Sequence, residues 1–326
     1  MVLGPLMAAT AIVAGVVIAL WTLTASEPRP EPRRATSAGP RVIATVPVAG
    51  SMNGSGVVAF GAVWVADAGR GEIVRIDPAT RRVTDRIPID AGANIDAGSG
   101  AVWAVRNESG SDRTELLRID PGTRRVAAHI PLRTRAGTFT GSGVVAGPRI
   151  WALGPNGAVR VDPVTERVGP RIDIAAGFTL RGALVRRGEL WLTDGSGATI
   201  RYDARTGRRL RRVAWNDGQA LLPAGNDLVR VGRNLVSRVD PATGRAAWRR
   251  RVGYEVLQAG VVGDRVLVIG TDGVNPREVL WELDVRTGRP ASRPLVMRQF
   301  GAAGIVAVGG DAWVLTNGGR AVVLRP

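Results

Sequence analysis

Short apolar stretches recur along the chain from residue 41 onward, separated by turns rich in Gly, Asp and Pro. In the first unit the apolar residues predict strands at 56–60, 62–67, 72–77 and 83–89. Residues 62–67 (Ala-Val-Trp-Val-Ala-Asp) are bounded by turn residues on both sides and are too few for a helix. The pattern therefore predicts four short β-strands in each unit of about forty residues.

One short phrase of the type Asp-Pro-Ala-Thr returns six times. Its aspartates are Asp77, Asp120, Asp162, Asp203, Asp240 and Asp284. A period near forty residues, built from short strands, is typical of the blades of a β-propeller. Each phrase falls between a third and a fourth strand, where an Asp carboxylate can accept backbone N–H groups and Pro presets φ. We therefore interpret these aspartates as turn residues, not as ligands.

Two further residue types recur at fixed places. Tryptophan stands in the predicted second strand of five units, at Trp64, Trp103, Trp151, Trp191 and Trp313. A large aromatic side chain at one register is expected to pack between adjacent blades. Pro47, Pro88 and Pro131 fall late in fourth strands, and proline is tolerated mainly at a sheet edge or strand end. The fourth strand should therefore be the outermost strand of each blade.

The two ends of the repeat region complete each other. Residues 304–307, 312–315 and 321–326 supply three strands of a seventh unit, with no fourth strand after them. Residues 41–48 match a fourth strand but precede the first unit. Pairing these two segments would complete one blade and cover both exposed edges. The sequence thus predicts an all-β fold over residues 41–326, a seven-bladed β-propeller of four-stranded blades.

The amino-terminal segment differs from the repeats. Residues 2–26 contain no charged side chain and are long enough to cross a membrane as one helix. Residues 1–26 are interpreted as a transmembrane anchor or a cleaved signal segment, and residues 27–40 as a Pro-rich linker. The arginines at 29, 33 and 34 would favour a cytoplasmic propeller. Because apolar amino-terminal segments commonly direct export, we expect an extracytoplasmic propeller at the cell membrane, secreted if the segment is cleaved.

The net charge of +16 changes this picture little. All 44 basic residues are arginine, as expected of GC-rich codon usage, and they are spread over every repeat. A nucleic-acid-binding protein would be expected to gather its basic residues on one face, so nucleic acid is not an expected partner. The absence of cysteine excludes disulfides, a thiolate nucleophile and a Cys-ligated metal.

The repeats resemble those of known bacterial propellers. Residues 61–67 (Gly-Ala-Val-Trp-Val-Ala-Asp) and 73–80 (Ile-Val-Arg-Ile-Asp-Pro-Ala-Thr) are similar to YVTN-type repeats and to the repeats of virginiamycin B lyase-like propellers. They resemble PQQ-binding-like propellers more distantly. The resemblance covers residues 41–326 and implies a seven-bladed fold. The members of these groups range from lyases to binding and sensory modules, so the resemblance does not select an activity.

The catalytic features of these relatives are not matched. The lyase resemblance would imply a metal-assisted site of histidine and glutamate, but the single histidine, His129, falls on a fourth strand at the register of Arg86. A PQQ enzyme would imply calcium and a quinone held by carboxylates and stacked tryptophans. The sequence contains no Asp-x-Asp-x-Asp-Gly loop, Gly-x-Ser-x-Gly elbow, Walker loop or Rossmann fingerprint. We predict no catalytic constellation, no metal and no cofactor.

The candidate site is the channel mouth, where the chain passes from each outer strand to the inner strand of the next blade. Nine residues at or beside these connections are candidate ligand-binding residues: Asn94, Phe139, Phe178, Trp215, Gln219, Tyr254, Glu255, Arg298 and Phe300. Exposed aromatic side chains beside amides and an arginine would suit a protein, peptide or glycan ligand. Alternatively, these side chains close the channel.

The leading hypothesis is a membrane-tethered, extracytoplasmic, non-enzymatic module for binding or sensing. The alternative is a lyase-like or hydrolase enzyme with its site at the channel mouth. Glu255 and Asp217 are the carboxylates there that could carry acid–base chemistry.

Overall fold

The computed structural model describes residues 39–326, apart from 49, 91–92, 108–113, 135–136, 139–142, 155–156, 175–179, 195–197, 215–219, 254, 272–276 and 298–300. The predicted anchor at 1–26 and nearly all of the linker at 27–40 lie outside the described residues. The part that is described contains no helix long and apolar enough to span a bilayer.

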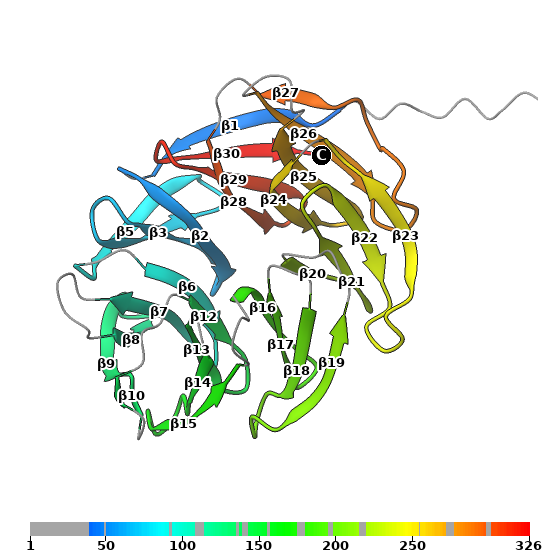
Figure 1. Ribbon diagram of the computed structural model, residues 1–326. Helices are drawn as coiled ribbons and strands as arrows, with labels where there is room; N and C mark the ends of the chain where they lie inside the picture. The colour runs from blue at the N-terminus through cyan, green and yellow to red at the C-terminus, as the bar shows by residue number, and fades with distance from the viewer. Residues whose placement is uncertain are drawn as a thin grey trace, which may run out of the picture. The chain divides into compact units, whose positions relative to one another are not determined.

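The described residues form seven four-stranded antiparallel sheets, arranged as the blades of a ring (Figure 1). Blades 1 to 4 are β2 (Met52–Ala59), β3 (Ala62–Asp67), β4 (Glu72–Asp77) and β5 (Arg82–Pro88); β6 (Ala93–Gly98), β7 (Ala101–Asn107), β8 (Thr114–Asp120) and β9 (Arg125–Pro131); β12 (Gly143–Ala146), β13 (Ile150–Gly154), β14 (Gly157–Val161) and β15 (Val168–Asp173); β16 (Leu180–Arg186), β17 (Glu189–Asp194), β18 (Ala198–Asp203) and β19 (Arg209–Ala214). Blades 5 to 7 are β20 (Ala220–Ala224), β21 (Asp227–Val231), β22 (Leu235–Val239) and β23 (Ala246–Arg251); β24 (Glu255–Val262), β25 (Arg265–Thr271), β26 (Glu278–Asp284) and β27 (Leu295–Met297); β28 (Ala302–Val308), β29 (Asp311–Thr316), β30 (Arg320–Arg325) and β1 (Arg41–Pro47). A small hairpin, β10 (Arg133–Thr134) and β11 (Gly137–Thr138), follows blade 2.

The ring closes as the sequence predicts. Strand β1 pairs antiparallel with β30, with Arg41 opposite Arg325 and Pro47 opposite Arg320. This blade has the strand order β1-β30-β29-β28, so the first and last described strands share one sheet. The first strand of each blade contacts the first strand of the next blade around the ring, ending with β28 against β2. The seven-bladed fold is confirmed.

Tryptophans fill the spaces between blades. The five aligned indoles are at most 3% exposed. Trp103 of blade 2, for example, lies in one hydrophobic cluster with Val144 and Ile150 of blade 3. Trp313 of blade 7 packs in the same way with Val63 of blade 1. The predicted packing role is confirmed, as is the placement of Pro47, Pro88 and Pro131 at the ends of outermost strands.

Each of the six repeated aspartates organises the turn after its third strand. The Asp77 Oδ1 atom accepts the backbone N–H of Ala79 at 2.8 Å and of Thr80 at 2.9 Å. The turns at Asp120, Asp162, Asp203 and Asp240 accept the equivalent pair of N–H groups, and Asp284 accepts that of Thr287. The interpretation of these residues as turn residues is confirmed.

These hydrogen bonds predict acid sensitivity. The N–H group of Thr123 is the largest cause that holds the pKa of Asp120 below its ordinary value, and Thr243 does the same for Asp240. A carboxylate with a lower pKa in the folded chain stabilises the fold above its unfolded pKa of about 3.9, and this contribution is lost as the pH falls through the folded pKa. The free energy of unfolding should therefore fall below about pH 4.

Urea unfolding between pH 3 and pH 7 measures this effect. The double variant Asp120→Asn/Asp240→Asn keeps an amide oxygen as acceptor in both turns but cannot take up a proton there. Its stability should decline less steeply than that of the parent chain at acid pH. Equal slopes for the two proteins would contradict the role given to these carboxylates.

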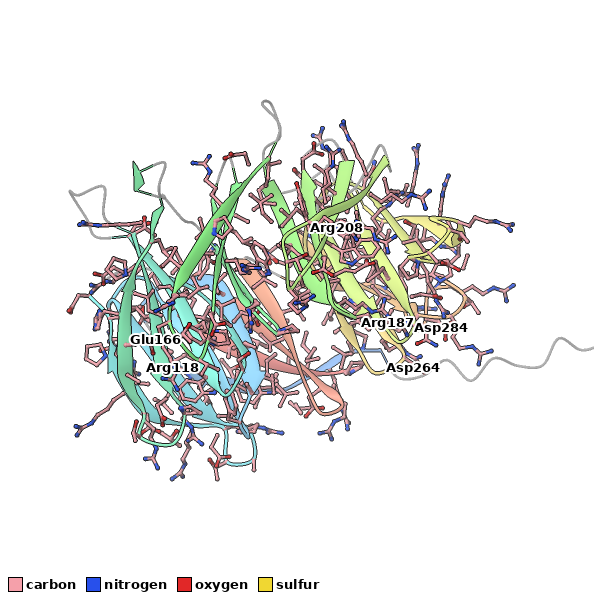
Figure 2. The ribbon with its side chains drawn as sticks, turned by 90° about the horizontal axis from the view of Figure 1, so that it is seen from below. Arg118, Glu166, Arg187, Arg208, Asp264 and Asp284 are labelled. Carbon is pink, nitrogen blue, oxygen red and sulfur yellow. The ribbon has the colours of Figure 1, made fainter. Side chains whose placement is uncertain are left out.

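The antiparallel order of strands divides the connections between two faces. One face, here called the mouth face, carries the connections from each fourth strand to the next blade and those from second to third strands. The opposite face, here called the turn face, carries the Asp turns and the connections from first to second strands. Arg187, Asp264 and Asp284 lie at this second edge in Figure 2. All of the predicted site residues belong to the mouth face.

Candidate functional site

Two of the nine candidate residues lie in the described part of the chain. Asn94 is the second residue of β6, and Glu255 is the first residue of β24; both side chains are exposed. The other seven lie outside the described residues, as does Asp217: Phe139, Phe178, Trp215, Gln219, Tyr254, Arg298 and Phe300. Asn94 and Glu255 both stand where inner strands leave the mouth face. They belong to blades 2 and 6, which are not neighbours in the ring.

A cavity of about 310 Å³ lies among the inner strands of blades 1 to 4. Its lining residues are Ser55, Asn94, Ile95, Gly143, Val144, Val145, Leu153, Leu180, Gly182 and Ala183. Most of them stand in the first half of an inner strand, next to the mouth face. The structure thus brings Asn94 together with residues from three other blades, whereas Glu255 is not part of this wall.

The cavity wall joins blades directly. Ile95 of blade 2 donates its backbone N–H to the Ser55 hydroxyl of blade 1 at 2.8 Å. Glycines at 143 and 182 and the small side chain of Ala183 leave space between the inner strands. The remaining wall is aliphatic, with Val144 and Leu180 on opposite blades. Such a mixture of apolar surface and a few polar groups is typical of recognition sites.

Asp96 is the nearest carboxylate on an inner strand, and its contacts define a structural role. Its Oδ2 atom accepts the backbone N–H of Ala146 in blade 3 at 2.8 Å, and its Oδ1 atom accepts that of Ala97 at 2.8 Å. Burial raises the pKa of Asp96, and these two hydrogen bonds oppose the rise. Within the described inner strands, Asp96 and Glu255 are the only carboxylates. Asp96 therefore links blade 2 to blade 3 and does not line the cavity.

His129 has the position that the sequence predicts. It lies on the outer strand β9 with its side chain 53% exposed, and its Nδ1 atom is 3.2 Å from Glu115 Oε2. Arg86 makes the matching contact with Glu72 in blade 1, at 3.1 Å. Across the described residues, no three His, Asp or Glu side chains are grouped so that they could hold a metal ion.

Sequence reasoning missed most of the cavity. Ser55, Val144 and Leu180 stand in short apolar strands that resemble the other strands of their blades. Which side of an inner strand faces the channel depends on how neighbouring blades pack, and a repeat pattern does not contain that information. The signal that could have found them is position, because each stands near the start of an inner strand.

The fold and this channel define the class of protein, a seven-bladed β-propeller of the PQQ-like type. A family model, PQQ_2, described as outer membrane protein assembly factor BamB, matches residues 195–326, which hold blades 5 to 7 and part of blade 4. Among solved structures, BamB from Moraxella catarrhalis superposes with a TM-score of 0.60 at 12% sequence identity. The match covers 89% of this chain and 98% of that one. No curated protein matches the sequence.

Proposed function

We propose that this chain is a membrane-tethered, extracytoplasmic propeller that binds a protein partner at the channel mouth without catalysing a reaction. The observation that carries the proposal is the cavity among the inner strands, which combines an aliphatic wall with Ser55 and Asn94 and includes no carboxylate or histidine. Acid–base chemistry needs a titratable group within hydrogen-bond reach of its substrate, whereas recognition needs shape and a few polar groups. The described wall supplies the second set.

The likeness to BamB supports a protein as the partner. BamB is named as an assembly factor for outer membrane proteins, and a factor of that kind works by contact with other proteins. A cavity of about 310 Å³ is large enough for one or two side chains of a partner segment. A peptide or a glycan would use the same wall, and the experiment below distinguishes these ligands by the mass of the adduct.

The tether is proposed from sequence. Residues 2–26 are uncharged and long enough to cross a bilayer, and the fourteen residues of the linker at 27–40 include several prolines. An extended Pro-rich chain spans about 3.1 Å per residue, so this linker would hold the propeller within about 40 Å of the membrane surface. Cleavage of the segment would instead release the propeller.

Photo-crosslinking from the two faces of the ring tests the binding proposal. A photoreactive amino acid at position 94 stands at the channel mouth, and one at position 226 stands in the first turn of blade 5 on the turn face. Both are asparagines in exposed or partly exposed settings, so the pair is matched. We expect a discrete protein adduct in cells from position 94 and at least about tenfold less from position 226. Equal adducts from both positions would contradict a binding site at the mouth.

The enzymatic alternative rests on Glu255, which is exposed at the start of β24, and on Asp217. It predicts that Glu255→Gln together with Asp217→Asn abolishes a turnover that the parent chain shows. A turnover that survives both substitutions would remove these carboxylates from consideration.

A further inference from the structure

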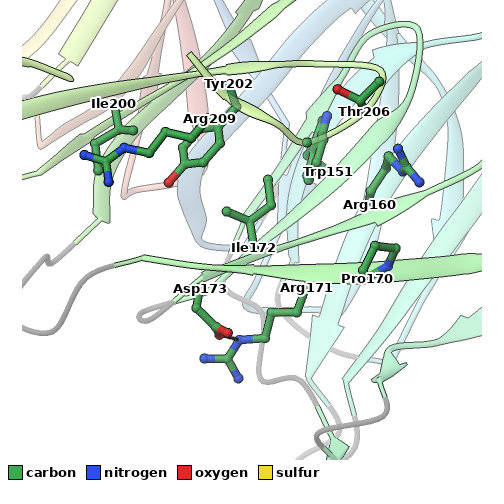
Figure 3. Close-up of a pocket in the computed structure, with 11 residues that line it drawn as sticks. Trp151, Arg160, Pro170, Arg171, Ile172, Asp173, Ile200, Tyr202, Thr206 and Arg209 are labelled. Carbon is green, nitrogen blue, oxygen red and sulfur yellow. Dashed lines mark ion pairs between the residues drawn. The ribbon is translucent and has the colours of Figure 1, made fainter. Parts of the chain in front are cut away.

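A second cavity lies on the circumference of the ring, between blades 3 and 4 (Figure 3). Its volume is about 320 Å³, at the lower end of the range for small-molecule sites. Trp151 and Ile172 of blade 3 and Tyr202 of blade 4 supply its less polar surface. Arg160, Arg171 and Arg209 stand around that surface.

The repeat shows that this place is unusual. In every blade, the last residue of the third strand before the Asp position pairs with one residue of the fourth strand. In blade 4 this pair is Tyr202 and Arg209. In the other six blades both members are apolar: Ile76–Val83, Ile119–Val126, Val161–Val168, Val239–Ala246, Leu283–Pro290 and Leu324–Val42. One blade of the seven thus places polar groups where the others fill the space with aliphatic side chains.

The Tyr202 hydroxyl is a donor that the chain itself does not use. Tyr202 is 4% exposed, and burial raises the pKa of its phenol, so the hydroxyl stays protonated at neutral pH. In the described part of the protein no atom forms a hydrogen bond with this hydroxyl. Burying an unpaired hydroxyl is unfavourable by itself. Figure 3 shows the hydroxyl directed toward the side where the Arg209 guanidinium lies.

Positive charge is left over at the cavity. Arg209 pairs with no carboxylate among the described residues. Arg171 Nε contacts Asp173 Oδ1 at 2.7 Å, but the Asp173 side chain is 80% exposed, so this pair is weak and can be exchanged. Blade 1 compensates the equivalent Arg86 with Glu72, whereas blade 3 has Gly157 in place of that glutamate. The cavity therefore carries three arginines against one exposed aspartate.

The cavity is also kept open locally. The Trp151 indole donates to the Ala204 carbonyl of blade 4 at 3.1 Å, whereas Trp64 and Trp103 donate within their own blades. Gly207 has φ +77°, and a Cβ atom there would lie 3.3 Å from the Trp151 ring. Blade 1 has Arg81 at the same turn position. A side chain at 207 would crowd the indole, and glycine leaves its face accessible.

We infer that this cavity binds a small organic anion, in which a carboxylate or phosphate group is attached to an apolar body. Guanidinium groups bind both anions through charge-assisted hydrogen bonds, and the Tyr202 hydroxyl adds a further donor. The apolar body would lie against Trp151 and Ile172. This site is separate from the cavity at the channel mouth, and its test is independent of the proposed function.

Calorimetric titration with benzoate and with phenyl phosphate tests the inference and distinguishes the two anions. Benzamide, which has the same ring and no charge, is the neutral control ligand. The key variant is Arg209→Val, which restores the aliphatic residue that blade 2 carries as Val126 and should therefore fold with undiminished thermal stability. Tyr202→Phe removes the hydroxyl alone. Arg208→Gln is the matched control, because Arg208 is exposed, adjoins Arg209 and does not line the cavity.

We expect at least one of the two anions to bind the parent chain and benzamide to bind at least about tenfold more weakly. Arg209→Val should weaken the anion by about tenfold or more, the size of one charge-assisted hydrogen bond, and Tyr202→Phe by about threefold or more. Arg208→Gln should leave the affinity unchanged. Binding that Arg208→Gln and Arg209→Val weaken equally, or no binding of either anion, would overturn the inference.

Discussion

Deletion of residues 41–47 from the chain is expected to abolish cooperative folding of the propeller or to lower its stability severely. Strand β1 supplies the outer strand of blade 7, and its Val46 is 4% exposed in a cluster with Trp313 and Val323. Without β1, the backbone groups of β30 lose their partners and the cluster opens to water. Each buried aliphatic side chain contributes about 1.5–3 kcal/mol, and a whole domain is stable by about 5–15 kcal/mol.

Urea unfolding monitored by tryptophan fluorescence measures this loss. A peptide of residues 39–48, added to the deletion variant, is the matched control because it can occupy the open edge of β30 and restore part of the stability. An unfolding midpoint that is unchanged by the deletion would show that blade 7 does not need its amino-terminal strand.

The replacement Trp103→Ala is expected to lower the free energy of unfolding by about 3–5 kcal/mol. Trp103 is fully buried, packs between blades 2 and 3 and donates its Nε1–H group to the Gly98 carbonyl at 2.9 Å. Alanine leaves a cavity that the two sheets can only partly fill, since each is held by its own ladder. The loss should exceed that of Trp248→Ala, because Trp248 is only partly buried.

Chemical unfolding of both variants provides the comparison. Trp103→Phe separates the two contributions, since it keeps an aromatic ring in the space and removes the hydrogen bond. It should lose less stability than Trp103→Ala. A loss below about 1 kcal/mol for Trp103→Ala would contradict a role for the aligned tryptophans in holding blades together.

Local patterns were sufficient for the strands and for ring closure. The predicted strands 62–67 and 72–77 coincide with β3 and β4, because apolar runs and turn residues define them within a few positions. The first strand of blade 1 was predicted at 56–60, whereas β2 begins at Met52. Residues 53–56 are Asn-Gly-Ser-Gly, which carry no apolar signal, and the pairing of β2 with β3 shifts register between Met52 and Gly56.

The binding surfaces were harder to predict because they depend on differences between repeats. The five tryptophans were treated as equivalent, yet the Trp151 indole bonds to the next blade. The arginine run at 208–212 was interpreted as a solvated rim, and Arg209 within it lines a cavity. The replacement of an aliphatic pair by Tyr202 and Arg209 is present in the sequence, but its meaning requires the pairing of β18 with β19.

Hydrogen–deuterium exchange of the propeller, with and without the protein captured from position 94, tests the central claim most directly. The claim is that the channel mouth is the binding surface of the ring. We predict slower exchange on binding near the starts of the inner strands, at 52–56, 93–96 and 180–183, and unchanged exchange in the Asp turns at 77–81 and 120–124. Protection of the Asp turns, with no change at the inner strands, would contradict the account.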